Sequence, residues 1–180
     1  MPPKQRITRE MILERSFTMF CQEGMEAVNA RSVAKALNCS TQPIFSYFTG
    51  MDDLKNALEM KAKETFELAL NNYETEGDPL LNVCRTYLHF GVMQPRLFAY
   101  LFMRPGHELG YSVIKEAENS ELVKREAEYL NMSVERALRL CVDVTIYTHG
   151  LATVQATKQH QVPMEELDVK LQRALEAFKA

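Results

Sequence analysis

The segment "RSVAKALNCSTQPIFSYFTGMDDL", residues 31–54, decides the fold, because two short apolar-patterned stretches flank a polar break. The first stretch carries its apolar residues at helical spacing: Val33, Ala34 and Leu37. Asn38 follows and can adopt a left-handed turn conformation. In the second stretch Pro43 stands in the first turn, where a missing N–H does no harm. The pattern predicts a helix over 30–37, a tight turn, and a helix over 41–48.

The second of these helices carries two kinds of side chain. Ile44, Phe45 and Phe48 can hold it to a core. Small and polar side chains occupy its other positions: Thr41, Gln42, Pro43, Ser46 and Tyr47. We therefore expect a helix that is anchored on one side and presents the other side to a partner.

Two short helices around a tight turn match the helix-turn-helix design for reading DNA. The major groove admits one helix, whose first residues can reach base edges. Gln42 can bond adenine with two hydrogen bonds, Thr41 or Ser46 can serve several bases, and Pro43 can pack on a thymine methyl group. Tyr47 could donate its hydroxyl to a phosphate. The alternative is a generic three-helix corner whose third helix is simply solvated.

Helical periodicity extends nearly throughout the chain, and no segment shows sustained alternation, so the sequence predicts an all-α fold. Thr8 is a plausible N-cap of the first helix, and Gly24 suits its C-terminal end. The predicted helices are 8–23, 30–37, 41–48, 52–74, 79–93, 95–103, two between 113 and 130, 133–159 and 164–178. We expect a three-helix head over 1–51 and a helical-bundle body over 52–180.

Composition and charge limit the class of protein. Apolar residues make up 46% and charged residues 25% of the chain, which indicates a folded globular protein. No run reaches the roughly 18 apolar residues of a membrane span, and the polar, basic start is not a secretory signal. The net charge of −3 is uneven, because residues 1–51 carry six Lys or Arg and only four Glu. A basic head on an acidic body favours a polyanionic partner at one end.

The cysteines indicate the compartment. They are far apart and embedded in apolar surroundings: Cys21, Cys39, Cys84 and Cys141. This distribution predicts reduced, buried thiols in a cytoplasmic protein rather than a disulfide framework or a zinc site.

No pattern points to an enzyme. The four histidines lack metal-ligand spacing with cysteines or carboxylates, and no nucleophile elbow or glycine-rich phosphate loop is present. Asp143 precedes His149 by nearly two helical turns, which implies no acid–base pair. We therefore expect neither catalysis nor a metal or other cofactor.

The first third of the chain resembles the N-terminal domain of the tetracycline-repressor (TetR) family of bacterial regulators. The matching pieces are "ILERSFTMFCQEG", "ARSVAKALNCS" and "TQPIFSYFTGMDDL". The resemblance implies an all-helical fold with a DNA-binding head, a ligand-binding and dimerising body, and a two-fold dimer. By position it also implies that Arg31 faces DNA together with Thr41, Gln42, Pro43, Ser46 and Tyr47.

This sequence departs from the family pattern at two backbone contacts. Phe45 replaces the usual Tyr, and Met51 stands where a phosphate-binding Lys is common. Binding would then depend on other cations for phosphate charge: Lys4, Arg6, Arg9, Lys35 and Lys55. We predict a weaker non-specific component of DNA binding than a typical member has.

The body resembles the same family in "TYLHFGVMQPRLFAYLFM", residues 86–103, where a Pro separates two helices lining a cavity, and in "YTHGLAT", residues 147–153. An apolar lining with a few polar groups suits a hydrophobic or aromatic effector. The expected lining residues are Tyr87, Phe90, Met93, Phe98, Phe102, His107, Tyr111, Tyr147 and His149. The alternative for each of them is ordinary core.

The last two long helices are the expected dimer interface. Their small residues would let helices approach closely, and their apolar residues form a stripe: Thr145, Thr148, Ala152, Ala156, Leu171, Leu175 and Phe178. The alternative is that both helices close the core of the single chain. A dimer would place two heads in successive major grooves, about 34 Å apart.

These expectations together describe an effector-responsive regulator that binds a near-palindromic double-stranded DNA operator as a homodimer, with repression implied by the resemblance alone. The alternative is a helical small-molecule carrier or interaction protein that has lost sequence-specific DNA binding.

Overall fold

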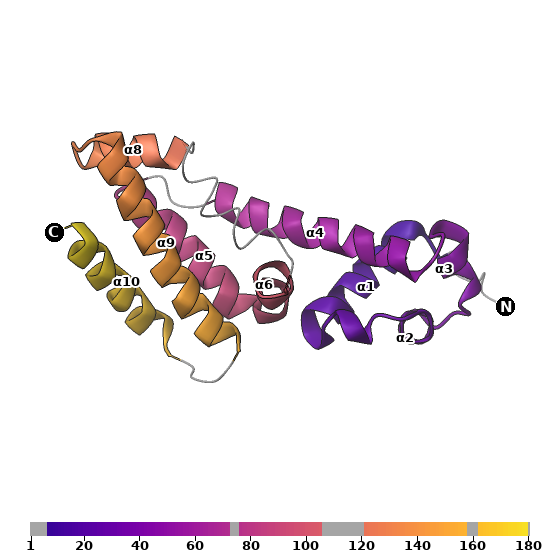
Figure 1. The fold of residues 1–180 in the computed structure, drawn as a ribbon. Coiled ribbons are helices and arrows are strands. Elements are labelled where there is room, and N and C mark those ends of the chain that lie inside the picture. Colours follow the sequence, from indigo (N-terminus) through magenta and orange to yellow (C-terminus); the bar gives the residue numbers. More distant parts are fainter. Residues whose placement is uncertain (1–6, 73–75, 106–120, 158–161, 180) are drawn as a thin grey trace. The chain divides into compact units, whose positions relative to one another are not determined.

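The computed structural model describes residues 7–72, 76–105, 121–157 and 162–179, and the regular elements within these ranges are all helices (Figure 1). Its contacts divide the chain into two compact units, Met1–Thr65 and Phe66–Ala180. Within the described ranges, no helix combines the length and apolar composition that crossing a bilayer requires.

The division lies inside α4 (Met51–Asn71) rather than at its start, where the sequence places the boundary. The reason is that the first half of α4 completes the core of the head. Leu54, Leu58 and Ala62 are fully buried, and Lys61 forms an ion pair with Glu14 of the first helix. Phe66, near the end of α4, instead packs against rings of the body.

The head begins with α1 (Arg9–Glu23). Its N-cap is Thr8, whose Oγ1 accepts a hydrogen bond from the Met11 N–H at 3.2 Å, as the sequence predicts. Gly24, at φ 97°, ends the helix and its N–H donates to the Phe20 carbonyl. A short 3-10 turn that the sequence does not predict, η1 (Met25–Ala27), then leads to α2.

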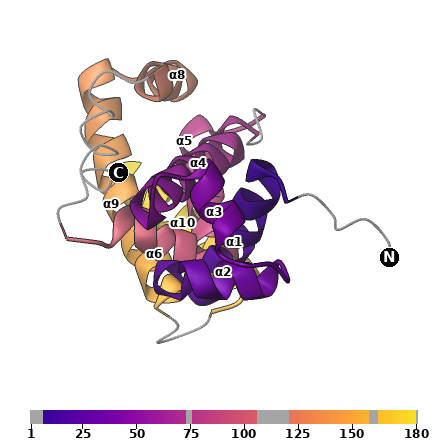
Figure 2. The same cartoon turned by 90° about the vertical axis from the view of Figure 1, so that its right-hand side faces the viewer.

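Two short helices complete the head, α2 (Ala30–Ala36) and α3 (Gln42–Tyr47), which Figure 2 shows beside α1. The core of this unit is formed by Ile12, Phe20, Val33, Ile44, Phe48, Leu54 and Leu58, all at most 1% exposed. Burial of large apolar side chains on every helix holds these short elements, which would not be stable alone.

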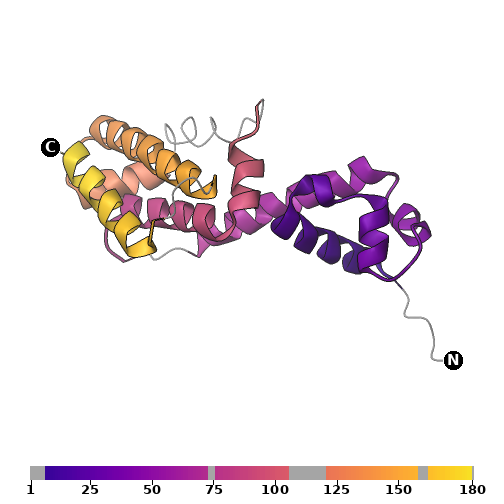
Figure 3. The ribbon, with the colours of Figure 1, turned by 90° about the horizontal axis from the view of Figure 1, so that it is seen from below.

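The body contains α5 (Pro79–Met93), α6 (Pro95–Phe102), α8 (Glu121–Tyr129), α9 (Val134–Ala156) and α10 (Met164–Lys179). Figures 1 and 3 show α5, α9 and α10 side by side. Gly91 permits a close approach of α5 to α9, because a Cβ there would lie only 3.0 Å from the Ala152 Cβ. One end of the bundle is filled by Leu80, Cys84, Val123, Ala127, Ala137, Leu140, Cys141, Val144, Leu171 and Leu175.

The all-α prediction is confirmed, and most helix ends fall within two or three residues of their expected positions. The first of the two helices expected between 113 and 130 starts outside the described residues. Asn38, at φ 51°, adopts the left-handed conformation that the sequence predicts. All four cysteines are free, but only Cys84 and Cys141 are buried, whereas Cys21 and Cys39 are half-buried.

Candidate nucleic-acid interface

The turn between α2 and α3 is fixed by local hydrogen bonds. At the start of α2, Asn29 Oδ1 accepts from the Ser32 N–H at 3.0 Å and Ser32 Oγ accepts from the Asn29 N–H at 3.1 Å. This reciprocal capping box satisfies two donors at the helix start. At the other end the Cys39 N–H donates to the Ala34 carbonyl at 3.0 Å across the left-handed Asn38. The direction in which α3 leaves α2 is therefore set by backbone geometry.

Helix α3 has one buried and one exposed face. Ile44 and Phe48, four residues apart, are 0% and 1% exposed. The rest of the helix surface carries the exposed residues Gln42, Phe45, Ser46 and Tyr47. Phe45 is 52% exposed, so the expectation that it anchors the helix is wrong. The helix has less than two full turns, and its contacts are made through Ile44 and Phe48 instead.

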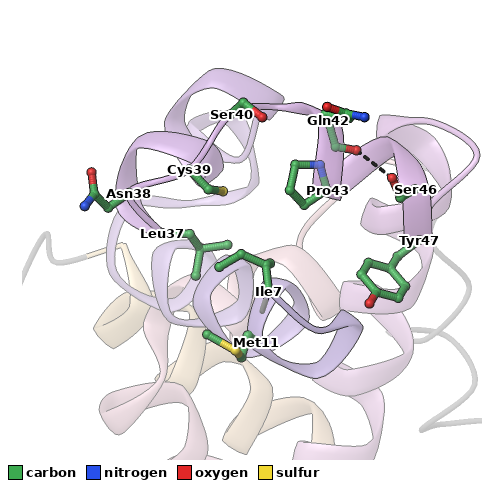
Figure 4. Close-up of a pocket in the computed structure, with 10 residues that line it drawn as sticks. All are labelled: Ile7, Met11, Leu37, Asn38, Cys39, Ser40, Gln42, Pro43, Ser46 and Tyr47. Carbon is green, nitrogen blue, oxygen red and sulfur yellow. Dashed lines mark hydrogen bonds between the residues drawn. The ribbon is translucent and has the colours of Figure 1, made fainter. Parts of the chain in front are cut away.

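The polar groups of α3 differ in what they can still bind. Ser46 Oγ donates to the Gln42 carbonyl at 3.0 Å, so its proton is used within the helix (Figure 4). The Gln42 side chain is exposed, and among the described residues its amide has no hydrogen-bond partner. Tyr47 is 39% exposed. Pro43, next to Gln42 in the first turn, is half-buried. Gln42 is therefore the best-placed side chain for a two-bond contact to a base.

A hollow of about 820 Å³ opens between the start of α1, the turn and α3 (Figure 4). It is lined by Ile7, Met11, Leu37, Asn38, Cys39, Ser40, Gln42, Pro43, Ser46 and Tyr47. None of these side chains is charged. Four of the six residues expected to read DNA therefore line one continuous concave surface.

The expected phosphate-binding cations are only partly accounted for. Arg31 and Lys35 are both exposed on α2, and both are available to a polyanion. The Arg9 guanidinium lies 5.0 Å from the centre of the Phe48 ring, and Lys55 is half-buried on α4. Lys4 and Arg6 lie outside the described residues.

In the body, several expected effector contacts form one aromatic cluster. Phe66 lies edge-on to Tyr87, Phe90 and Phe102, with ring centres 5.8, 5.1 and 4.9 Å away. Phe98 packs against Tyr87 at 5.3 Å and Phe102 at 5.0 Å. The cluster is thus a packed apolar core, to which the second half of α4 contributes Phe66.

One polar pair lies within this cluster. The Tyr87 hydroxyl is 2.8 Å from His149 Nδ1. Burial raises the pKa of the Tyr87 phenol and lowers the pKa of His149 below its usual 6.5. Both groups are therefore neutral at pH 7, with Tyr87 able to donate to an unprotonated Nδ1.

Two further expected effector contacts, Met93 and Tyr147, do not join the cluster. Met93 is 73% exposed, so its side chain does not line an enclosed site. Tyr147 packs edge-on against Phe178 with ring centres 6.4 Å apart. His107 and Tyr111 lie outside the described residues.

Four of the seven residues expected at a dimer interface are buried inside the single chain. Thr148, Ala152, Leu171 and Leu175 are at most 1% exposed. The Thr148 hydroxyl donates to the Val144 carbonyl at 2.7 Å within its own helix. The expectation that these four side chains contact a partner is wrong, because α5, α9 and α10 cover them. Phe178 is 44% exposed, while Thr145 and Ala156 are half-buried.

Sequence reasoning gives no indication of the buried carboxyl of Glu126, which is 0% exposed on α8. Its Oε2 accepts from the Leu80 N–H at 3.0 Å, and among the described residues its Oε1 has no hydrogen-bond partner. Burial raises its pKa to about 7, and the negative charge of Asp78 adds to this effect. Lys179 pairs with Asp78 at 3.0 Å. No group of three or more metal-ligating side chains occurs in the described parts of the chain.

Known proteins resemble this chain in structure but not detectably in sequence. No protein-family model matches the sequence, and no curated protein matches it. The structure of a TetR-like transcriptional regulator from Rhodococcus sp. RHA1 is similar, with a TM-score of 0.62 at 15% identity, covering 94% of this chain and 96% of that one. A second transcriptional regulator from the same Rhodococcus gives a TM-score of 0.62 at 14% identity, with 96% of each chain covered.

A third solved structure, RolR without ligand, has a TM-score of 0.56 at 16% identity and covers 95% of each chain. In all three cases the similarity extends over both units. The chain therefore has the fold of TetR-like transcriptional regulators.

Proposed function

We propose that this protein is a cytoplasmic, DNA-binding transcriptional regulator rather than an enzyme, and that it represses its target genes until an effector binds. The observation that carries the proposal is the exposed face of α3, held by a capped α2 and a fixed turn in the head of a regulator fold. A helix presented in this way fits the major groove, and Gln42 provides a free amide at its first position.

We infer a two-fold dimer that uses the outer faces of α9 and α10. Ile146, Gly150 and Val154 are exposed along one side of α9 at four-residue spacing. On the neighbouring α10, Val169 is 44% exposed. An exposed apolar stripe of this kind is typical of an interaction surface, and a symmetric dimer buries the same stripe on both copies.

The effector would bind beside the aromatic cluster of the body. Its rings favour an apolar or aromatic molecule, and the Tyr87–His149 pair offers one hydrogen-bonding position. Binding there would regulate DNA affinity only if the effector prefers one of two arrangements of the dimer.

The first experiment is selection of genomic fragments by the purified protein at near-physiological salt, followed by sequencing. We expect a near-palindrome whose half-sites lie about one helical turn apart. Arg31→Ala and Lys35→Ala should weaken binding to all fragments alike, because both remove phosphate contacts. Arg96→Ala is the matched control, since Arg96 is an exposed arginine on α6 of the body.

Failure to enrich any sequence, also after addition of cell extract as a source of corepressor, would contradict the proposal. The helical carrier that has lost DNA binding would then be the better description.

The salt dependence of binding tests the electrostatic part of the proposal. Phe45 and Met51 carry no hydrogen-bond donor for phosphate, so we expect few released counterions. A plot of log affinity against log salt should have a shallow slope. A slope that corresponds to about ten or more counterions would contradict this expectation.

A further inference from the structure

The most exposed aromatic ring among the described residues of the head is Phe45, which is 52% exposed on a helix of six residues. Phe20 and Phe48 of the same unit are each 1% exposed. Leaving a phenyl ring in water forgoes the favourable free energy of its burial. In a head this small, nothing in the packing of α3 requires a ring at this position, since Ile44 and Phe48 already hold the helix.

The ring lies among polar side chains. Gln42 stands three positions before it on α3, exposed Ser46 follows it directly, and exposed Thr49 lies just beyond the end of the helix. The Ser46 proton is already donated to the Gln42 carbonyl, and the Thr49 hydroxyl lies 3.3 Å from Asp53 Oδ2. The exposed surface of α3 therefore offers the free amide of Gln42, the purely apolar ring of Phe45 and the phenol ring of Tyr47.

A phenyl ring can recognise only one feature of a base edge in the major groove. It has no donor or acceptor for the polar atoms of adenine, guanine or cytosine. Thymine alone presents an apolar group there, its C5-methyl, and phenylalanine is among the side chains that contact it. A phosphate, in contrast, would gain no hydrogen bond from this side chain.

We propose that Phe45 determines sequence specificity by packing on the C5-methyl group of a thymine in each half-site of the operator. The inference rests on the proposed function, because it requires α3 to enter the major groove. It assigns the two main readers of α3 different tasks: Gln42 bonds a base edge, and Phe45 detects the presence of a methyl group.

The test is a thymine-to-uracil scan of the selected operator. Uracil keeps the Watson–Crick pairing and lacks only the methyl group. Each thymine is replaced in turn, symmetrically in both half-sites, and the affinity is measured by fluorescence anisotropy. For the wild-type protein we expect at least one position at which affinity falls about fourfold for each methyl group removed.

Variants then assign that loss to Phe45. The Phe45→Ala variant should bind the operators with thymine and with uracil at the sensitive position equally well. Its affinity for either operator should not exceed that of the wild type for the uracil operator. Phe45→Leu, which keeps an apolar side chain, should retain part of the preference for thymine. Met60→Ala is the matched control, since it removes a 63% exposed apolar side chain from α4 of the same unit and should leave the preference unchanged.

Two outcomes would overturn the inference alone. In one, a sequence is selected but no thymine is sensitive to loss of its methyl group. In the other, Phe45→Ala keeps the full preference of the wild type, so another residue reads the methyl. If the wild-type protein selects no sequence at all, the proposed function fails and the inference fails with it.

Discussion

At the scale of single residues, the Tyr87–His149 hydrogen bond is the polar contact of an otherwise apolar cluster. Tyr87→Phe removes the hydroxyl and leaves His149 Nδ1 without its partner. We expect the free energy of unfolding to fall by about 1–2 kcal/mol, the cost of losing one bond in a largely buried site.

Urea unfolding followed by circular dichroism measures this change. Tyr129→Phe is the control, because Tyr129 is 53% exposed on α8 and should tolerate the same change without loss. Equal effects of the two substitutions would mean that the Tyr87 hydroxyl contributes nothing to stability.

Glu126 is the residue at which pH should act on stability. Its pKa is raised from 4.5 to about 7, so the folded state binds the proton more tightly than the unfolded state. The contribution of the protonated carboxyl is fully present below pH 4.5 and is lost as pH rises through about 7. The corresponding slope is at most about 1.4 kcal/mol per pH unit.

Glu126→Gln removes this titration but keeps an oxygen that can accept from the Leu80 N–H. We expect the variant to gain stability over the wild type as pH rises from 5 to 8 in urea unfolding experiments. Glu128→Gln, an exposed neighbour on α8, should follow the wild type. Parallel pH profiles of wild type and Glu126→Gln would show that Glu126 does not titrate in this range.

At the scale of helices, the approach of α5 to α9 depends on Gly91. A Cβ at this position would lie 3.0 Å from the Ala152 Cβ and 3.5 Å from the Ala152 Cα. Neither atom can rotate away, so Gly91→Ala must push the two helices apart. We expect a loss of about 1–3 kcal/mol through overpacking, despite the better helix propensity of alanine.

Gly150 of α9 provides the matched control, since nothing lies within 4 Å of a Cβ built there. Gly150→Ala should stabilise the helix by up to about 1 kcal/mol. Urea unfolding at two protein concentrations separates folding from association. A loss in Gly150→Ala as large as that in Gly91→Ala would contradict the packing argument.

At the scale of the whole molecule, the proposed dimer should depend on the apolar stripe of α9. Ile146 is 52% exposed in the single chain, so Ile146→Glu should not disturb folding. In a two-fold dimer it would bury two unpaired carboxylates, and we expect the dissociation constant to rise at least about tenfold. Sedimentation equilibrium measures this constant directly.

Leu68→Glu introduces the same charge at a 61% exposed leucine on α4 and should leave the dimer intact. Of the two variants, only Ile146→Glu should lose DNA affinity, because a dissociated single chain has one head and contacts only one half-site. A dimer that survives Ile146→Glu unchanged would place the interface elsewhere.

The sequence by itself determined the helical fold and the positions of the two short helices around the turn at Asn38. Caps and breaks such as Thr8, Gly24, Asn38 and Pro43 act through local backbone geometry, so they can be recognised without knowledge of distant contacts. For Tyr87, Phe90, Phe98 and Phe102 the sequence offered two alternatives, the lining of a cavity or ordinary core, and the structure packs their rings together.

Only the tertiary structure decided which apolar residues remain exposed. Ile44 and Phe45 are adjacent on a helix of less than two turns, and periodicity alone does not say which of them faces the core. Leu171 and Leu175 form the same apolar stripe whether their partner is α5 or a second chain. A sequence shows how much apolar surface must be covered, whereas the packed fold determines which residues cover it. For this reason the pattern did not predict that Phe45 is exposed or that Glu126 is buried.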